Sequence, residues 1–148
     1  MLHEPPRNDQ GGVIPHDHSG IESDDGIIRR VSRQFVVFDP KIGGERVSTM
    51  AVQPSSGPNG GMSVDLQCAI EQAGLNAGEY VVTPRWIGAI RFEAGQLRAE
   101  EFKVGFHPLP NQPYHGEVWG KFTHSKQKKL LKLAQWFVTI KDVALYPE

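Results

Sequence analysis

The chain has 148 residues, 16 Lys and Arg against 17 Asp and Glu, a net charge of −1 and one cysteine. A domain of this length buries roughly 68–70% of its unfolded surface, so it needs no disulfide or metal to hold a core. The charge balance gives no sign of a polyanionic partner for the chain as a whole, so any such site would be local, and we find no apolar run of the roughly 18 residues that a membrane span needs. Cys68, set among apolar residues, predicts a buried thiol. We therefore expect a cytoplasmic protein.

Residues 1–26 are rich in Pro, Gly, His, Asp and Ser and show neither helical nor strand periodicity. Such a composition buries too little apolar surface to offset the entropy lost on ordering. We predict a flexible N-terminal arm over 1–26, ordered only against a partner, followed by a single domain over 27–148.

Strands are predicted by runs of β-branched and aromatic residues. Residues 27–39 predict one or two strands, and residues 46–52 predict another that follows a turn at Gly43-Gly44, so the two form a hairpin. Residues 101–106 alternate apolar and polar side chains, which is typical of a half-buried strand. Residues 86–92 fit either a strand or a short helix.

Helical spacing of apolar residues occurs in two places. Residues 62–74 predict a helix with Ser63 or Asp65 as its N-cap and Gly74 at its end. Residues 125–140 predict an amphipathic helix that closes the core. The order of these elements favours an α+β fold, with a small, mainly antiparallel sheet and two principal helices.

The segment "HPLPNQPYHGEVWG", residues 107–120, is the strongest candidate for a functional loop. Its three prolines remove backbone donors and stiffen the chain, which lowers the entropy lost when its polar groups bind a ligand. If His115 and Glu117 lie on one strand they face the same side, where the carboxylate could orient the imidazole for proton transfer. Alternatively, the histidines only hydrogen-bond the turn. The polar candidates here are His107, Asn111, His115 and Glu117.

A basic pair, Arg29-Arg30, lies on the first predicted strand. One of the two must face the core or a pocket, where an arginine needs a partner and suits phosphate or carboxylate. The alternative is a pair of exposed arginines that discourage aggregation. Ser63 and Asp65 are predicted as helix caps, but a helix that follows a Gly-rich loop can also bind an anion through its amides.

Metal and nucleic acid are weaker possibilities. His16 and His18 form a His-x-His pair that could hold Zn²⁺ or Ni²⁺ only with further ligands, so we expect no metal and no cofactor. Lysines near the C-terminal helix could contact nucleic-acid phosphates, although a lysine-rich helix face is commonly only solvated, so nucleic acid is not favoured. These lysines are Lys121, Lys126, Lys128, Lys129 and Lys132.

The motifs "IIRRV", "SVDL", "AGQLRA" and "HPLPNQPYHGEVWGK" resemble a family of small uncharacterised bacterial proteins. The family pattern pairs two arginines with Ser-Val-Asp and Asn-x-x-His, and the resemblance covers about 27–138. Val52 replaces a phenylalanine of the pattern, and Gln112 separates the asparagine from the proline. The resemblance implies a bacterial protein and names no reaction. The residues it carries over are Arg29, Arg30, Ser63, Asp65, Asn111 and His115.

A more distant resemblance is to ADP-ribosyltransferase-like folds. Their order of an arginine, a serine and a late glutamate is matched by Arg30, Ser63 and Glu117. The resemblance implies an enzyme that acts on a nucleotide-like anionic substrate.

Two functions follow as expectations. The favoured one is an accessory or adaptor domain that binds a protein partner through the loop 107–120 and the arm. The alternative is an enzyme in which an arginine holds a nucleotide-like anion and His115 moves a proton, with Ser63 and Glu117 beside it. An enzyme requires these side chains to converge on a concave pocket, whereas an adaptor does not.

Overall fold

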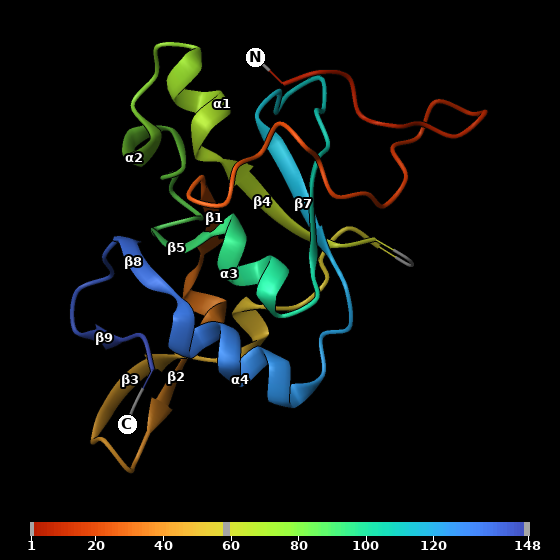
Figure 1. Ribbon diagram of the computed structural model, residues 1–148. Helices are drawn as coiled ribbons and strands as arrows, with labels where there is room; N and C mark the ends of the chain where they lie inside the picture. Colours follow the sequence, from red (N-terminus) through yellow and green to blue (C-terminus); the bar gives the residue numbers. More distant parts are fainter. Residues whose placement is uncertain (1, 58–59, 147–148) are drawn as a thin grey trace.

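The computed structural model describes residues 2–57 and 60–146 (Figure 1). Its larger sheet has the strand order β6-β7-β4-β1-β5-β8, and each neighbouring pair is antiparallel. The strands of this sheet are β1 (Gly26–Val31), β4 (Met62–Leu66), β5 (Gly88–Glu93), β6 (Lys103–Phe106), β7 (His115–Trp119) and β8 (Gln135–Val138). A smaller sheet has the order β2-β3-β9, with β2 (Val36–Asp39), β3 (Gly44–Val47) and β9 (Val143–Ala144). The predicted hairpin is β2 and β3.

The described ranges hold four α-helices and two 3₁₀ helices. They are α1 (Gln67–Gln72), α2 (Ala77–Tyr80), α3 (Ala94–Ala99), α4 (His124–Leu133), η1 (Arg33–Phe35) and η2 (Thr49–Ala51). The mixed α/β fold with a mainly antiparallel sheet agrees with the sequence prediction. The prediction of two principal helices is not confirmed, because among the helices of the described ranges only α4 exceeds six residues. No helix in the described part of the chain has the length and apolar composition of a membrane span.

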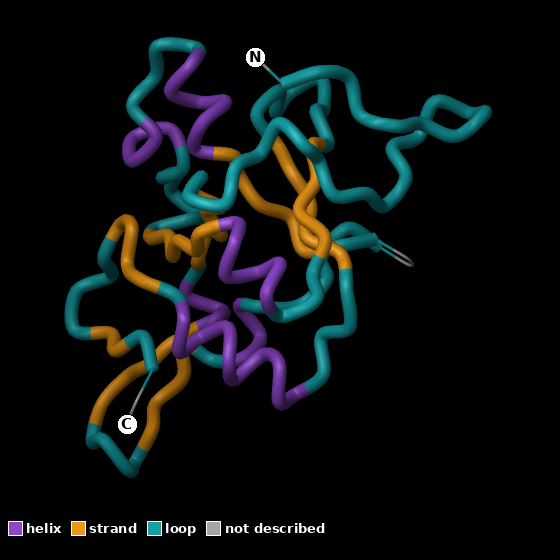
Figure 2. The backbone as a smooth tube through the Cα atoms, viewed as in Figure 1, coloured by secondary structure: helices purple, strands orange, loops and turns teal. Residues whose placement is uncertain are grey.

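Alternating side chains of β1 enter two separate cores. Ile27 and Val31 belong to the main core, together with Leu97 of α3 and Leu130 of α4. Ile28 faces the other way and joins a smaller core formed with α1 and α2. Figure 2 shows these two groups of helices beside the sheet. Each fully buried aliphatic side chain contributes about 1.5–3 kcal/mol, so both faces of β1 help to stabilise the fold.

β4 occupies the place where the sequence predicts the start of a helix. Met62, Val64 and Leu66 are buried in the main core, so Ser63 and Asp65 lie on the opposite face of the strand. Helix α1 begins only at Gln67, and its N-cap, Leu66, makes no side-chain cap. The prediction that Ser63 or Asp65 caps this helix is therefore wrong, because pairing with β1 and β7 holds the segment extended.

The C-terminal helix is shorter than predicted. Helix α4 ends at Leu133, and Ala134 is already extended, with φ −65° and ψ 149°. Residues 135–138 then form β8, which pairs with β5. Aromatic and β-branched side chains in this segment favour a strand once a partner strand is present. Residues 86–92, left open by the sequence, fall mainly in β5, and α3 follows with a capping box between Glu93 and Gln96.

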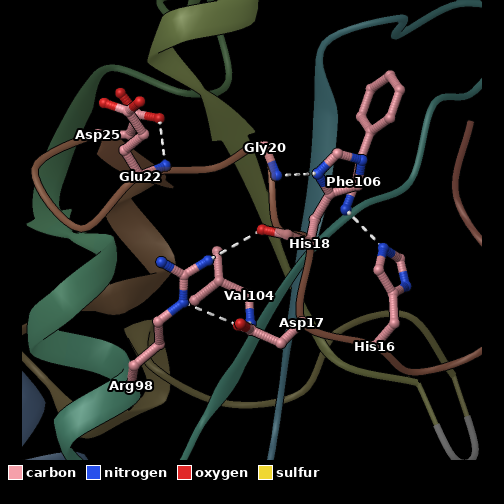
Figure 3. Close-up of polar contacts among 9 residues, drawn as sticks. All are labelled: His16, Asp17, His18, Gly20, Glu22, Asp25, Arg98, Val104 and Phe106. Atoms are coloured by element: carbon pink, nitrogen blue, oxygen red, sulfur yellow. Dashed lines mark hydrogen bonds and ion pairs between the residues drawn. The ribbon is translucent and has the colours of Figure 1, made fainter. Parts of the chain in front are cut away.

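The N-terminal arm lies against β6 and α3 (Figure 3). The Asp17 carboxylate accepts hydrogen bonds from the Arg98 side chain at 2.9 Å and from the Val104 backbone N–H at 3.0 Å. The His18 N–H donates to the Val104 carbonyl, and the Phe106 N–H donates to Nε2 of His16. These contacts anchor residues 16–18, while the mobility of the arm in solution stays a prediction.

Candidate functional site

The larger sheet opens between β1 and β4. These strands pair only at Ile27 with Leu66 and at Ile28 with Asp65. Beyond that point β1 pairs with β5 alone, and β4 pairs with β7 alone. Backbone groups along such an opening require partners, because an unpaired buried carbonyl costs free energy. Arg29 supplies such a partner to the Ser63 carbonyl, whereas Arg30 links the two strands through the side chain of Asp65.

Arg29 fills the opening from the side of the main core. Its Nε donates to the Ala51 carbonyl at 2.8 Å, and its Nη1 donates to the Ser63 carbonyl at 2.9 Å and to Ser55 Oγ at 3.2 Å. The residue is 6% exposed, and burial lowers the pKa of its guanidinium to about 10. It is therefore still charged at neutral pH. Its Nη2 donates to no acceptor among the described residues.

Arg30 faces the other side of β1 and binds Asp65. Nε donates to Oδ2 at 2.8 Å and Nη2 donates to Oδ1 at 3.0 Å, a two-point ion pair. The guanidinium also lies 5.5 Å from the ring centre of Tyr80 in α2. Both arginines of the pair therefore have hydrogen-bond partners in the fold.

A cleft of about 450 Å³ lies over this opening. We use "the cleft" for this cavity and its lining. Its ionisable and hydroxyl groups are Arg29, Arg30, Ser55, Ser63, Asp65, Arg85 and His115. A second part of the wall comes from Phe35 and Trp86, whose ring centres are 6.0 Å apart, with Arg85 5.0 Å from the Trp86 ring. Asp65 is the one acidic side chain in the described lining, so positive charge is in excess.

His115 begins β7 and is 5% exposed at the wall of the cleft. Its Nδ1 lies 2.8 Å from the backbone carbonyl oxygen of His107 and 3.1 Å from Nδ1 of the His107 ring. His107 follows β6 directly, and its N–H donates to the His115 carbonyl at 2.9 Å. His115 is therefore oriented by His107, where the sequence interpretation gave this task to Glu117.

Glu117 lies on the same face of β7 as His115, as predicted for residues two apart on a strand. It is opposite Ser63 in the β4–β7 register and is only 2% exposed. Its carboxylate accepts no hydrogen bond from the described residues. Because the register places Arg30 on this face as well, Arg30, Ser63 and Glu117 occupy one face of three adjacent strands.

Ser63 also holds the loop that precedes β4. Its Oγ lies 2.8 Å from Ser56 Oγ, and its N–H donates to Ser55 Oγ at 3.0 Å. Ser55 therefore joins the Ser63 backbone and Arg29 in one network at the wall of the cleft.

Not all predicted site residues come together. Asn111 is exposed in the turn between β6 and β7 and does not line the cleft, whereas its neighbour Gln112 does. Sequence reasoning missed Ser55, Phe35 and the pair Arg85-Trp86. The string Pro-Arg-Trp at 84–86, a cation beside an aromatic ring in a loop, is the signal that could have found that pair.

The remaining candidates have structural contacts. His18 is buried, with Nε2 2.9 Å from the His3 carbonyl oxygen and Nδ1 accepting from the Gly20 N–H. Between residues 2 and 146, with 58–59 left aside, no group of three or more metal-ligating side chains has a suitable geometry. On α4, Lys126 and Lys129 both bind the Glu100 carboxylate, at 3.2 and 3.0 Å. That pairing reduces the charge that the helix offers to phosphates.

Comparison with known proteins gives no relative from which to assign this site. No family model, no curated protein and no solved structure matches the chain. The family resemblance noted in the sequence thus rests on the quoted motifs, and the function must be inferred from the cleft.

Proposed function

We propose that this protein is an enzyme that binds a nucleotide-like anion in the cleft and uses His115 to move a proton. The observation that carries the proposal is the convergence of arginines, aromatic rings and a buried histidine on one cavity of about 450 Å³. Cavities of roughly 300–1,000 Å³ that combine aromatic walls with a few polar groups are typical of small-molecule sites.

The charge of the cleft supports an anionic ligand. Arg29, Arg30 and Arg85 contribute three guanidinium groups against the single carboxylate of Asp65. Arg30 is already bound by Asp65, so Nη2 of Arg29 and the exposed Arg85 are the groups available to a ligand. Guanidinium groups bind phosphate oxygens in pairs, and such bonds are stronger than those between neutral groups.

The aromatic wall supports a ligand with a planar ring. Phe35 and Trp86 lie beside each other at the cleft, and Arg85 is close to the Trp86 ring. Stacking of a nucleobase on an aromatic side chain contributes about 1–3 kcal/mol. A base on this wall and a phosphate on the arginines describe a nucleotide.

The placement of Arg30, Ser63 and Glu117 supports the ADP-ribosyltransferase-like form of the proposal. They lie on adjacent strands with a common face, and Arg30 and Ser63 also line the cleft. Glu117 is a buried carboxylate next to them on β7, although it does not itself line the cleft. ADP-ribose and NAD⁺ therefore belong among the first ligands to test.

Calorimetric titration with AMP, ADP, ADP-ribose, NAD⁺, pyrophosphate and adenosine tests the binding step. We expect a phosphorylated nucleoside to bind and Arg85→Ala to weaken it about tenfold, which corresponds to one lost charge-assisted hydrogen bond. Arg33→Ala is the matched control, because Arg33 is exposed and pairs with Glu45 outside the cleft. If none of the six ligands binds, or if both variants behave alike, the proposal fails.

Turnover is tested with the ligand that binds most tightly. The protein is incubated with it, and the products are followed by ¹H and ³¹P NMR. His115→Gln keeps a hydrogen-bonding side chain but cannot take up a proton, so we expect binding within about threefold of wild type and no turnover. A His115→Gln variant that turns the ligand over at the wild-type rate excludes His115 as the proton acceptor.

An adaptor that binds a protein partner is the second candidate. It is supported by the turn between β6 and β7, where apolar Leu109 is 37% exposed beside Pro110 and Asn111. A pull-down with wild type, the Leu109→Ala/Asn111→Ala double variant and His115→Gln separates the two proposals. A partner lost only in the double variant supports the adaptor, whereas one retained by all three proteins does not use this turn.

A further inference from the structure

The His107–His115 contact determines which nitrogen of His115 carries the proton. A backbone carbonyl oxygen only accepts hydrogen bonds, and the one of His107 lies 2.8 Å from Nδ1 of His115. The proton of His115 is therefore on Nδ1. A neutral imidazole has one N–H, so Nε2 keeps a free lone pair. This nitrogen has no donor among the described residues, and His115 is one of the residues that line the cleft.

The same contact determines the state of His107. Its Nδ1 is 3.1 Å from Nδ1 of His115, which already carries a hydrogen. Two N–H groups cannot point at each other across that distance, so Nδ1 of His107 is bare and its proton is on Nε2. One N–H of His115 is thus shared between two acceptors of His107, the carbonyl oxygen and the ring nitrogen. The arrangement requires a neutral His107.

The surroundings of His107 keep it neutral near pH 7. Burial lowers its pKa, and the positive charge of Arg7 and the rings of His115 and His16 act in the same direction. The carboxylate of Glu117 opposes them. The backbone holds the pair in register, because the His107 N–H donates to the His115 carbonyl and Pro108 fixes the next φ angle.

We propose that His107 is the positioning residue of His115. When His107 is neutral, it holds the Nε2 lone pair of His115 toward the cleft, and when His107 is protonated, that lone pair no longer faces the cleft. With protons on both Nδ1 atoms the pair repels, so His115 must turn or move its proton to Nε2. The cleft then loses its proton acceptor as the pH falls below the pKa of His107. This inference rests on the proposed function only in treating Nε2 as the acceptor that the reaction uses.

NMR of the full chain labelled with ¹⁵N histidine tests the proposal directly. Long-range ¹H–¹⁵N correlations at pH 8 should show His115 protonated at Nδ1 and His107 at Nε2. On titration downward, the ring nitrogens of His115 should change at the pH where His107 takes up its proton. A His115 ring protonated at Nε2 at pH 8, or one that does not respond to His107, overturns the proposal.

Variants show whether His107 is the cause. His107→Phe keeps a ring and the backbone carbonyl but removes the second acceptor and the titrating group, and His107→Gln serves if the phenylalanine does not fold. In either variant, the change in the His115 ring nitrogen signals that accompanies protonation of His107 should disappear. His124→Phe is the matched control, because His124 is exposed at the start of α4. An unchanged His115 titration in both His107 variants contradicts the positioning role.

The same samples separate this inference from the proposed function. If His115 has the expected protonation but no nucleotide binds, the proposed function fails and the tautomer assignment stands. If a nucleotide binds and turns over while His115 carries its proton on Nε2 at pH 8, the positioning role fails and the proposed function stands.

Discussion

Arg30 and Asp65 form a two-point ion pair, at 2.8 and 3.0 Å, where the backbone pairing of β1 with β4 stops. The side chains are 17% and 6% exposed. This ion pair therefore links β1 and β4 through side chains where the backbone hydrogen bonds between the two strands end.

Removing one partner of this pair should destabilise the fold. Asp65→Asn leaves a partly buried guanidinium without its counter-charge, and we expect a loss of about 2 kcal/mol in the free energy of unfolding, below the value for fully buried pairs because Arg30 keeps some solvent. Urea denaturation measures it. Asp9→Asn, at an exposed site in the arm, is the control. The double variant Arg30→Met/Asp65→Asn tests whether the two side chains are coupled. If its loss of unfolding free energy equals the sum of the losses in the two single variants, the coupling is absent.

Arg29 should be more sensitive to a conservative change. Lysine keeps the charge but cannot reach the Ala51 carbonyl, the Ser63 carbonyl and Ser55 Oγ together, so a buried carbonyl is left unpaired. Arg29→Lys should cost about 2–3 kcal/mol, measured as a shift of the urea midpoint at constant m. Arg33→Lys, which is exposed, should cost less than about 0.5 kcal/mol. Equal midpoints for the two variants would refute the role of Arg29 in closing the sheet.

Cys68 should react slowly. Burial raises the pKa of its thiol to about 11, and the charge of Asp25 acts in the same direction. Because the pKa is raised from 9.0 to about 11, the thiolate fraction at pH 8 is about 100-fold lower than for an ordinary cysteine. Only the thiolate is nucleophilic, so the reaction rate falls in proportion. Alkylation by iodoacetamide, followed by mass spectrometry, should be about 100-fold slower than for the urea-unfolded chain. Similar rates in the two states would show that the thiol is accessible.

His18 should make the arm sensitive to acid. Burial lowers its pKa below the ordinary 6.5, so the unfolded chain binds the proton more readily than the folded one. The contribution of neutral His18 to the free energy of unfolding is therefore fully present above about pH 6.5, and it is lost as the pH drops toward the folded-state pKa. Protonation also replaces the lone pair of Nδ1 that accepts from the Gly20 N–H. The protection of the Gly20 N–H against hydrogen exchange, taken relative to the intrinsic exchange rate at each pH, should therefore fall between pH 6.5 and 5.

The control for this prediction is His18→Phe. It removes the proton-binding group together with the two hydrogen bonds of the ring, so the variant should be less stable at pH 8 but show a flatter dependence of stability on pH. His107 shifts in the same direction and remains in the variant, so some dependence persists. If the free energy of unfolding of the variant depends on pH as steeply as that of the wild type, the acid sensitivity comes from a group other than His18.

The sequence predicts local features of the fold better than the site. Period-two alternation places His115 and Glu117 on one face of a strand, and Gly43-Gly44 joins a hairpin, because each depends on neighbouring residues. Ser63 and Asp65 fit a helix cap as well as a strand, and only pairing with β7 decides between them. The boundary between α4 and β8 depends on β5 in the same way.

The cleft itself has no local signal. It exists because β1 and β4 separate after two residue pairs, which is a property of the whole sheet. Phe35 comes from η1, and Ser55 and Trp86 come from two loops that are distant from it in the sequence, yet all three line this opening. Arg29 and Arg30 could be predicted to need partners, since burying a guanidinium alone is costly, but not which partners.

The arm has a further consequence for the state of the protein at high concentration. Strand β6 ends the larger sheet, and its outward peptide groups at Val104 and Phe106 are occupied by His16, Asp17 and His18. If a protease removed these residues, β6 would offer an uncovered strand edge to any neighbouring chain, and such edges promote association between sheets. Proteolytic removal of the arm should therefore convert a dispersed protein into one that self-associates through β6.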